Sequence, residues 1–210
     1  METKVVIFDL DGTLYDNRGL ASYLIFMNIF HLNLLGAERM ERKNISGTHY
    51  GSAEELLSDL FSRISSRTGR KYESVKRWYT KKYLLKQARA LSFFFKAKPW
   101  VKPMLQDLKK RGIKTVCFSD YGAVEEKLGG IGLNAKLFDL VIDAPTAGGL
   151  KPCRESFLRI AEIMNVRPSE ILVLGDRQDA DGKGAALAGM RFMLVSRDSS
   201  KVPDIKSFLK

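Results

Sequence analysis

Cysteine is scarce in this chain, and its two cysteines form no recognisable metal pattern. Cys117 and Cys153 are far apart in the sequence, and both fall in stretches that read as core elements. We therefore expect two reduced, buried thiols. Residues 1–4 lead directly into an apolar run, so we also expect no signal peptide and a cytoplasmic location. At 210 residues, 45% apolar and 28% charged, the composition is typical of a soluble globular chain with one domain, or a core with one insertion.

A long, purely apolar run is also missing. The longest uncharged stretch, residues 19–37, is interrupted by the polar side chains of Ser22, Tyr23, Asn28, His31 and Asn33. Each buried polar group lowers the tendency of a segment to enter a membrane. Its apolar residues recur at helical spacing, at Leu20, Leu24, Met27 and Leu34. We predict a helix packed against neighbouring elements, and no membrane partner.

Acidic residues are few between Arg67 and Lys98. This stretch holds eleven Lys or Arg residues and one acid, Glu73, in a chain with a formal net charge of +11. Such a charge can attract polyanions or steer anionic substrates. No nucleic-acid motif accompanies it, so we interpret the stretch as a solvated helix face and do not expect a nucleic-acid partner. The charge favours an anionic substrate over a cationic one.

The first half of the chain, after an initial apolar run, reads as helix. Ser52, followed three residues later by Glu55, forms a capping box at the start of one of these helices. The predicted helices cover residues 19–42, 52–67 and 71–92. Two prolines, Pro99 and Pro103, then mark a change of pattern. The chain shows no internal repeats and no low-complexity tract.

Strands and helices alternate through the second half. The predicted strands are 113–118, 138–142, 171–174 and 192–195, and the predicted helices are 103–111, 124–128, 152–164 and 180–188. Alternation of this kind is typical of an α/β fold, a Rossmann-like parallel sheet with helices on both faces. We predict a core made of residues 1–15 and 96–210, with a helical domain, residues 16–95, inserted after the first strand.

Two carboxylates follow the first strand directly. Asp9 and Asp11 belong to the string Phe-Asp-Leu-Asp-Gly-Thr-Leu, which comes straight after the apolar run Val5-Val6-Ile7. The carboxyl end of a buried parallel strand is where α/β sheets place their chemistry. Two carboxylates there could hold a hard divalent cation, and one could attack an electrophile. A strand followed by an ordinary acidic turn is the structural alternative.

Three later strings place further polar side chains at strand ends or helix starts. Ser119 ends a strand and could hold a phosphate oxygen, and Lys151 precedes a helix that Pro152 is predicted to open. Asp176 follows the buried strand Ile-Leu-Val-Leu-Gly, and Asp181 lies five residues later. These acids could complete an oxygen cage for Mg²⁺.

In order and spacing, the four strings resemble the four motifs of the haloacid dehalogenase (HAD) superfamily, whose members are mostly phosphatases that form an aspartyl-phosphate intermediate. The resemblance implies that Asp9 is the nucleophile and Asp11 the general acid and base. It implies that Ser119 and Lys151 bind the phosphoryl group. It also implies that Mg²⁺ is the cofactor, held by Asp9, the backbone carbonyl of Asp11, Asp176 and, in a supporting role, Asp181. The family's helical cap lies where residues 16–95 are inserted.

The resemblance predicts a Mg²⁺-dependent phosphomonoesterase for a small, soluble, anionic phosphate ester. Asp11 favours phosphoryl transfer over dehalogenation, since the dehalogenases lack an aspartate at this position. A phosphomutase of the β-phosphoglucomutase type shares all four motifs and stays an alternative. So does a protein that binds a polyanion through the basic stretch. The sequence leaves open whether the protein is a monomer or a homodimer.

Overall fold

Five parallel strands form the centre of the molecule in a computed structural model that describes residues 2–209. The strands are β1 (Val5–Asp9), β2 (Lys114–Ser119), β3 (Leu140–Asp143), β4 (Ile171–Gly175) and β5 (Arg191–Leu194), in the order β3-β2-β1-β4-β5. The predicted α/β class and parallel sheet are confirmed. β1 lies in the middle, with Asp9 level with Phe118 of β2, so the ends of the central strands meet at one edge.

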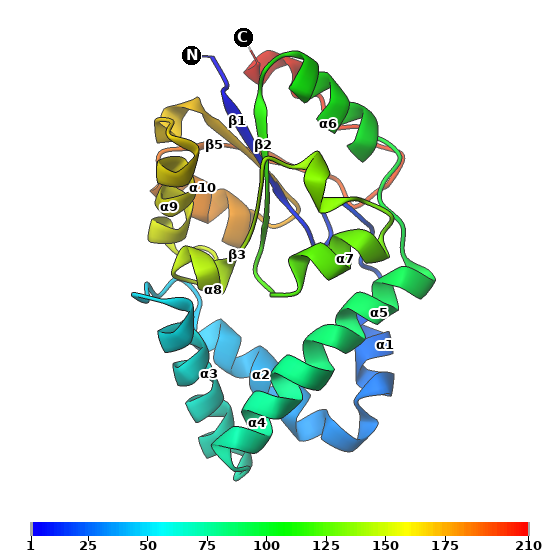
Figure 1. Cartoon of the computed structure of the whole chain (residues 1–210), viewed down its shortest axis with the longest axis vertical. Coiled ribbons are helices and arrows are strands. Elements are labelled where there is room, and N and C mark those ends of the chain that lie inside the picture. Colours follow the sequence, from blue (N-terminus) through cyan, green and yellow to red (C-terminus); the bar gives the residue numbers. More distant parts are fainter. Residues whose placement is uncertain (1, 210) are drawn as a thin grey trace.

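Each face of the sheet packs against its own helices. Alternate residues of a strand point to opposite faces of the sheet. Ile7 therefore packs in the apolar cluster that includes side chains of helices α9 (Arg154–Met164) and α10 (Lys183–Leu187). Phe8 packs in the cluster on the other face, with side chains of α6 (Val101–Lys110) and α7 (Val124–Gly130). Figure 1 shows these pairs of helices on either side of the strands. Because both faces are covered, the strands are nearly continuous apolar runs.

Helices α1 to α5 lie together at the end of the molecule opposite the chain termini (Figure 1). They are α1 (Leu20–Met27), α2 (Leu32–Ile45), α3 (Ala53–Thr68), α4 (Tyr72–Trp78) and α5 (Leu84–Phe94), with a π-helical turn, Tyr79–Tyr83, joining the last two. The hydroxyl of Ser52 accepts a bond from the amide of Glu55, as the capping box predicts. The division into residues 16–95 and a separate core stays a prediction.

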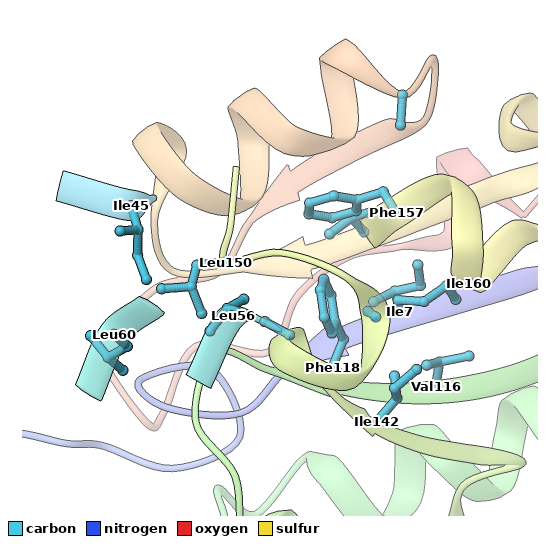
Figure 2. Packing of buried hydrophobic residues seen from close by; sticks show 14 of the residues in the cluster. Ile7, Ile45, Leu56, Leu60, Val116, Phe118, Ile142, Leu150, Phe157 and Ile160 are labelled. Carbon is cyan, nitrogen blue, oxygen red and sulfur yellow. The ribbon is translucent and has the colours of Figure 1, made fainter. Parts of the chain in front are cut away.

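The apolar core runs without a break from the sheet into these helices. Leu150, in the loop before α9, belongs to one cluster with Phe118 of β2 and with Ile45 and Leu56 of α2 and α3. Figure 2 shows Leu150 between the sheet residues and the helical ones. The helical segment and the sheet therefore share one core. Burial of each side chain of this size stabilises the folded state by about 1.5–3 kcal/mol.

The predicted helix over 19–42 is wrong as a single element. The chain bends by 80° at a break between Met27 and Ile29. The side chain of Asn28, which is buried, donates to the carbonyl of Leu24 and so satisfies the end of α1. The bend leaves Leu24 and Leu34 buried but exposes Met27. Among residues 2–209, no single helix is long and apolar enough to cross a membrane, although the two bent halves pass that test together by length and composition.

Two predicted helix starts also differ. α6 begins at Val101, ahead of Pro103, and α9 begins at Arg154, so Pro152 does not open a helix. Cys153 instead bonds through its amide to the carbonyl of Leu150, which makes a turn before α9. A residue before proline is pushed out of helical geometry, and Lys151 is left free to reach back toward the sheet. The helix predicted over 180–188 is shorter: residues 178–182 form a π-helical turn, and α10 begins at Lys183.

Candidate active site

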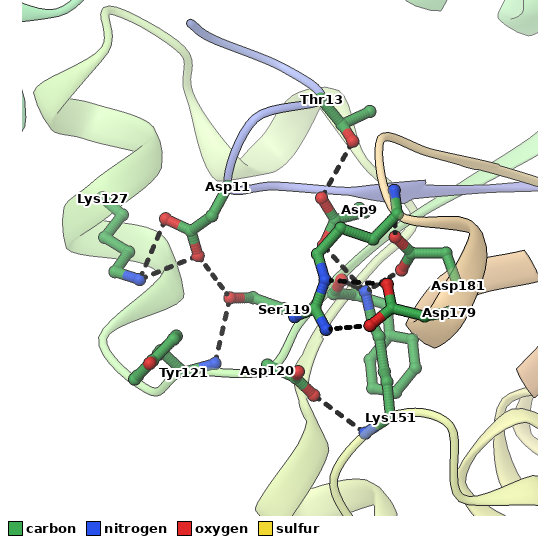
Figure 3. A network of polar contacts seen from close by, with 12 residues as sticks. Asp9, Asp11, Thr13, Ser119, Asp120, Tyr121, Lys127, Lys151, Asp179 and Asp181 are labelled. Carbon is green, nitrogen blue, oxygen red and sulfur yellow. Dashed lines mark hydrogen bonds and ion pairs between the residues drawn. The ribbon is translucent and has the colours of Figure 1, made fainter. Parts of the chain in front are cut away.

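The predicted site residues converge at the carboxyl ends of three adjacent strands. Asp9 is the last residue of β1, Ser119 is the last of β2, and Asp176 directly follows β4. Lys151 and Asp181 reach the same place from the loop before α9 and from the π-helical turn after β4 (Figure 3). Strand order explains the meeting, because β1 lies between β2 and β4.

Lys151 joins two of the acids. Its Nζ lies 2.8 Å from Asp9 Oδ1 and 2.8 Å from Asp181 Oδ1, and it also donates to the carbonyl of Phe118 at 2.9 Å. The second oxygen of Asp9 accepts a bond from the hydroxyl of Thr13 at 2.8 Å. Lys151, Asp9 and Asp181 are all buried, so this ion pair network lies in a region of low dielectric.

Two of the acids are harder to ionise than an ordinary carboxyl group. Burial raises the pKa of Asp9 to about 8, against the opposing effect of Lys151 and with the help of Asp181. Burial, together with Asp181, also raises the pKa of Asp176 in spite of Arg197, whose Nε lies 3.1 Å from Asp176 Oδ2. Carboxylates in this state gain stability from any further positive charge nearby.

Three of these acids fit a hard cation. Asp9, Asp176 and Asp181 each offer an oxygen, and the three oxygens lie within 4.8 Å of one another. Asp176 Oδ1 is buried and has no hydrogen-bond partner among residues 2–209. Gly12, at φ +98°, lets the backbone pass close by, since a Cβ there would lie 2.4 Å from Asp176 Oδ2. An oxygen-only set of this kind suits Mg²⁺.

Asp11 has a separate group of partners. Lys127 Nζ lies 3.0 Å and 3.3 Å from its two oxygens, the hydroxyl of Ser119 donates to it at 3.2 Å, and the hydroxyl of Tyr15 donates as well. Burial alone would raise the pKa of Asp11, but Lys127, Tyr15 and Ser119 together hold it below its ordinary value. The two motif carboxylates therefore have different electrostatic surroundings: Asp9 with Lys151, and Asp11 with Lys127.

The helical segment contacts the loops that carry the site. Arg42 of α2 donates to the carbonyl of Asp120 at 2.6 Å, and its guanidinium lies 4.0 Å from the centre of the Tyr121 ring. The carboxylate of Asp120 accepts the backbone amide of Lys151 at 2.9 Å, and Ser46 donates to the carbonyl of Lys151 at 2.6 Å. The loop after β2 is thus held between α2 and Lys151.

Sequence reasoning missed several of these partners. The missed side chains are Thr13, Tyr15, Arg42, Lys127 and Arg197, together with Lys98, whose Nζ donates to the carbonyl of Gly12 at 3.0 Å. The role of Thr13 could have been predicted, because it lies four residues after Asp9 and threonine hydroxyls often form hydrogen bonds with groups nearby in the sequence. Lys127 carried no signal, because it is one lysine among many in the sequence and only the fold shows that it is buried. Asp179, which was given no role, is exposed and pairs with Arg177.

Comparison with known proteins agrees with the motifs. The model of the haloacid dehalogenase-like hydrolase family matches residues 3–189. The chain belongs to this family. A phosphoglycolate phosphatase from Aquifex aeolicus is 28% identical over 206 residues, which cover 96% of this chain and 90% of that protein. The family and this relative support the predicted class, an enzyme of the phosphatase type.

Solved structures share the fold. A β-phosphoglucomutase from Clostridium difficile has a TM-score of 0.65 at 21% identity, covering 92% of this chain and 85% of its own. YfnB from Bacillus subtilis, described as bound to magnesium and as showing interdomain movement, has a TM-score of 0.64 at 17% identity, covering 97% and 93%. At these identities the likeness concerns the fold alone.

Proposed function

We propose that this chain is a Mg²⁺-dependent phosphomonoesterase that hydrolyses a small, anionic phosphate ester through a phosphorylated Asp9. The observation that carries the proposal is the buried arrangement of Asp9, Lys151 and Asp181 at the strand ends, with Asp11 beside it. A purely structural ion pair would not require a second aspartate with its own lysine. The cytoplasmic location and the monomeric or homodimeric state stay predictions.

The chemistry follows from what these side chains can do. An oxygen of Asp9 attacks phosphorus, and the bond from phosphorus to the ester oxygen breaks. Asp11 gives a proton to the departing alkoxide, and it must take up that proton before the transfer, because its partners in the free protein hold its pKa below the ordinary value. Asp11, now ionised, takes a proton from water, which attacks the phosphorus and frees phosphate and Asp9. Lys151 and the hydroxyl of Ser119 would offset and orient the charge of the phosphoryl group.

A magnesium ion would be held by the oxygens of Asp9, Asp176 and Asp181 and by the carbonyl of Asp11. When bound, it would offset the negative charge that otherwise separates an anionic nucleophile from an anionic substrate. The raised pKa of Asp9 and of Asp176, and the unpartnered Asp176 Oδ1, are what favour a cation here.

We further propose that residues 16–95 act as a cap over the strand ends. The contacts of Arg42 and Ser46 with the loops around Asp120 and Lys151 support this, since movement of α2 would move both loops. A cap would govern substrate entry and exclude water during transfer. Chemistry and substrate choice would then reside in different segments.

The proposed substrate class is supported by a relative and by the net charge of the chain. The Aquifex relative is named for phosphoglycolate, a small phosphorylated acid, and the net charge of +11 favours an anion. A phosphomutase reaction is the second candidate, because the fold is shared with a β-phosphoglucomutase. It would require a sugar bisphosphate and release little phosphate.

The decisive variant is Asp9→Asn, a nearly isosteric change whose amide cannot form an acyl phosphate. We expect phosphate release from p-nitrophenyl phosphate and from 2-phosphoglycolate to fall to background, and the acid-quenched parent, but not the variant, to carry a phosphate on the peptide containing Asp9. Release by the parent should stop in EDTA and return with Mg²⁺.

Asp179→Asn is the matched control, since Asp179 is exposed and contacts Arg177 alone among the acids and bases of the site region. It should behave like the parent. Near-normal turnover by Asp9→Asn would refute the covalent mechanism, and full activity after exhaustive chelation would refute the metal site.

A further inference from the structure

Lys127 is a fully buried lysine that no motif predicts. It lies on α7, and 1% of its side chain is exposed. Lysine is almost never buried to this extent without a partner, because an ammonium loses its hydration. Its Nζ donates to both oxygens of the Asp11 carboxylate, at 3.0 Å and 3.3 Å, rather than to one of them alone. Figure 3 shows the pair apart from the Asp9 group.

The pair fixes the direction in which Asp11 points. Two further donors, the hydroxyls of Tyr15 and Ser119, approach the same carboxylate, so its rotation is limited from three sides. Lys151, the other buried lysine with acidic partners, contacts Asp9 and Asp181 instead. Asp9 and Asp11 therefore pair with different lysines.

The helix that carries Lys127 is itself held firmly. A Cβ on Gly130, at the end of α7, would lie 3.0 Å from the carbonyl of Ala88 in α5, so the two helices are in close contact. The ammonium of Lys127 also lies 4.9 Å from the centre of the Tyr121 ring, which Arg42 of α2 approaches at 4.0 Å. The position of Lys127 thus depends on the helical segment as well as on the sheet.

We propose that Lys127 is a positioning residue that holds the carboxyl group of Asp11 toward the leaving-group oxygen of the substrate. This inference rests on the proposed function, in which Asp11 delivers that proton. Lys127 exchanges no proton and touches no substrate. Its effect should therefore be largest where protonation of the leaving group matters most, in alkyl phosphates, and small for p-nitrophenyl phosphate, whose leaving group needs little protonation.

The test compares the two kinds of ester in Lys127→Met, an uncharged side chain of similar length that can stay buried. We expect kcat on 2-phosphoglycolate to fall by about 10²–10³-fold, within the range of a general acid–base contribution. The fall on p-nitrophenyl phosphate should be at least about tenfold smaller. In an Asp11→Asn background, Lys127→Met should add no further difference between the esters, because the two residues act as one unit.

Lys98→Met is the matched control. Lys98 is also a buried lysine near the site, but its Nζ donates to the carbonyls of Gly12 and Ser196, at 3.0 Å and 2.9 Å. Any loss in this variant should be equal on the two esters. If Lys127→Met gives no folded protein by circular dichroism, Lys127→Gln carries the same comparison, since it removes the charge and keeps a polar end.

Equal losses on both esters in the Lys127 variant would overturn the inference and leave Lys127 a structural ion pair. So would a further leaving-group effect of Lys127→Met on top of Asp11→Asn. Neither outcome touches the proposed function, which fails separately if Asp9→Asn stays active or the parent releases no phosphate.

Discussion

The buried charges of this chain differ in how well they are compensated. Asp11 receives both hydrogen bonds and an ion pair at 3.0 Å, and its pKa is lowered. Glu38 of α2 is more deeply buried, and its partners are weaker: Arg42 lies 3.6 Å away, and the hydroxyl of Tyr83 donates to Oε2 at 3.2 Å. Glu38 Oε1 has no hydrogen-bond partner among residues 2–209. Burial raises the pKa of Glu38 to about 7, with Arg42 opposing the shift. An ionised Glu38 is thus a cost to the folded state.

Glu38→Gln should therefore change how stability depends on pH. The folded protein binds a proton at Glu38 more tightly than the unfolded chain does, so this residue's contribution is present below about pH 4.5 and is lost as the pH rises through about 7. At pH 8 we expect the variant to be more stable than the parent by on the order of 1–3 kcal/mol. Near pH 5, just above the ordinary pKa of a glutamate, the difference should be much smaller. Urea unfolding at both pH values measures the difference.

Glu162→Gln, at an exposed position of α9, is the control and should change little at either pH. If the difference in unfolding free energy between Glu38→Gln and the parent did not vary between pH 5 and pH 8, the Glu38 side chain would be ionised over that whole range.

Among the elements, α10 depends most on small side chains. Gly184 lies over the ring of Phe157 in α9, and a Cβ at Gly184 would stand 2.1 Å from Phe157 Cε2. The helix can approach α9 this closely only because Gly184 has no side chain. The turn that precedes α10 carries Asp181, which pairs with Lys151.

Gly184→Ala should destabilise the protein by about 1–3 kcal/mol, the usual effect of overpacking in a core. Gly36→Ala makes the same change in α2, at a helical position where a new Cβ meets nothing within 4 Å. There we expect a gain of about 0.5–1 kcal/mol from helix propensity. Urea unfolding of the two variants gives the comparison. Equal effects would mean that Phe157 moves aside without cost.

Across the whole molecule, the basic stretch divides into exposed and buried charges. Lys98 is buried at the site, and Lys86 donates to the carbonyl of Met27, which ties α5 to the end of α1. Others are exposed on α4 and the π-helical turn, at the end of the molecule opposite the termini (Figure 1): Lys76, Arg77, Lys81 and Lys82. The exposed group is the part that can act at a distance.

Neutralising the four exposed residues together should lower kcat/KM for an anionic ester at low salt and flatten its dependence on salt, with kcat nearly unchanged. The physical reason is a field that salt screens over about 8 Å at physiological ionic strength. The measurement is kcat/KM against ionic strength. The control removes the same charge from exposed positions on and beside α6, namely Lys102, Lys109, Lys110 and Lys114.

Identical salt curves for the parent and the first variant would make the charge a solvated surface only. An unchanged kcat/KM with lost binding to a polyanion such as heparin would assign the group to a partner instead.

The sequence by itself determined the strands and their succession along the chain, because an apolar run specifies a buried strand. A parallel sheet then carries Asp9, Ser119 and Asp176 to one edge. The place of Lys151 was predicted from the family resemblance, and the order of the strands in the sheet was not predicted. The bend at Asn28 and the late start of α9 after Pro152 were not predicted, because they depend on what the chain packs against rather than on local preference.

Only the tertiary structure decided which buried charges are partners. Lys127 lies 116 residues from Asp11, and Lys151 lies 142 residues from Asp9. The family resemblance predicted the second lysine's place but not the first's, since nothing near Lys127 in the sequence marks it as buried. Whether a lysine is buried, and which acid it pairs with, depends on how distant segments pack. Here α7 packs against both the sheet and α5.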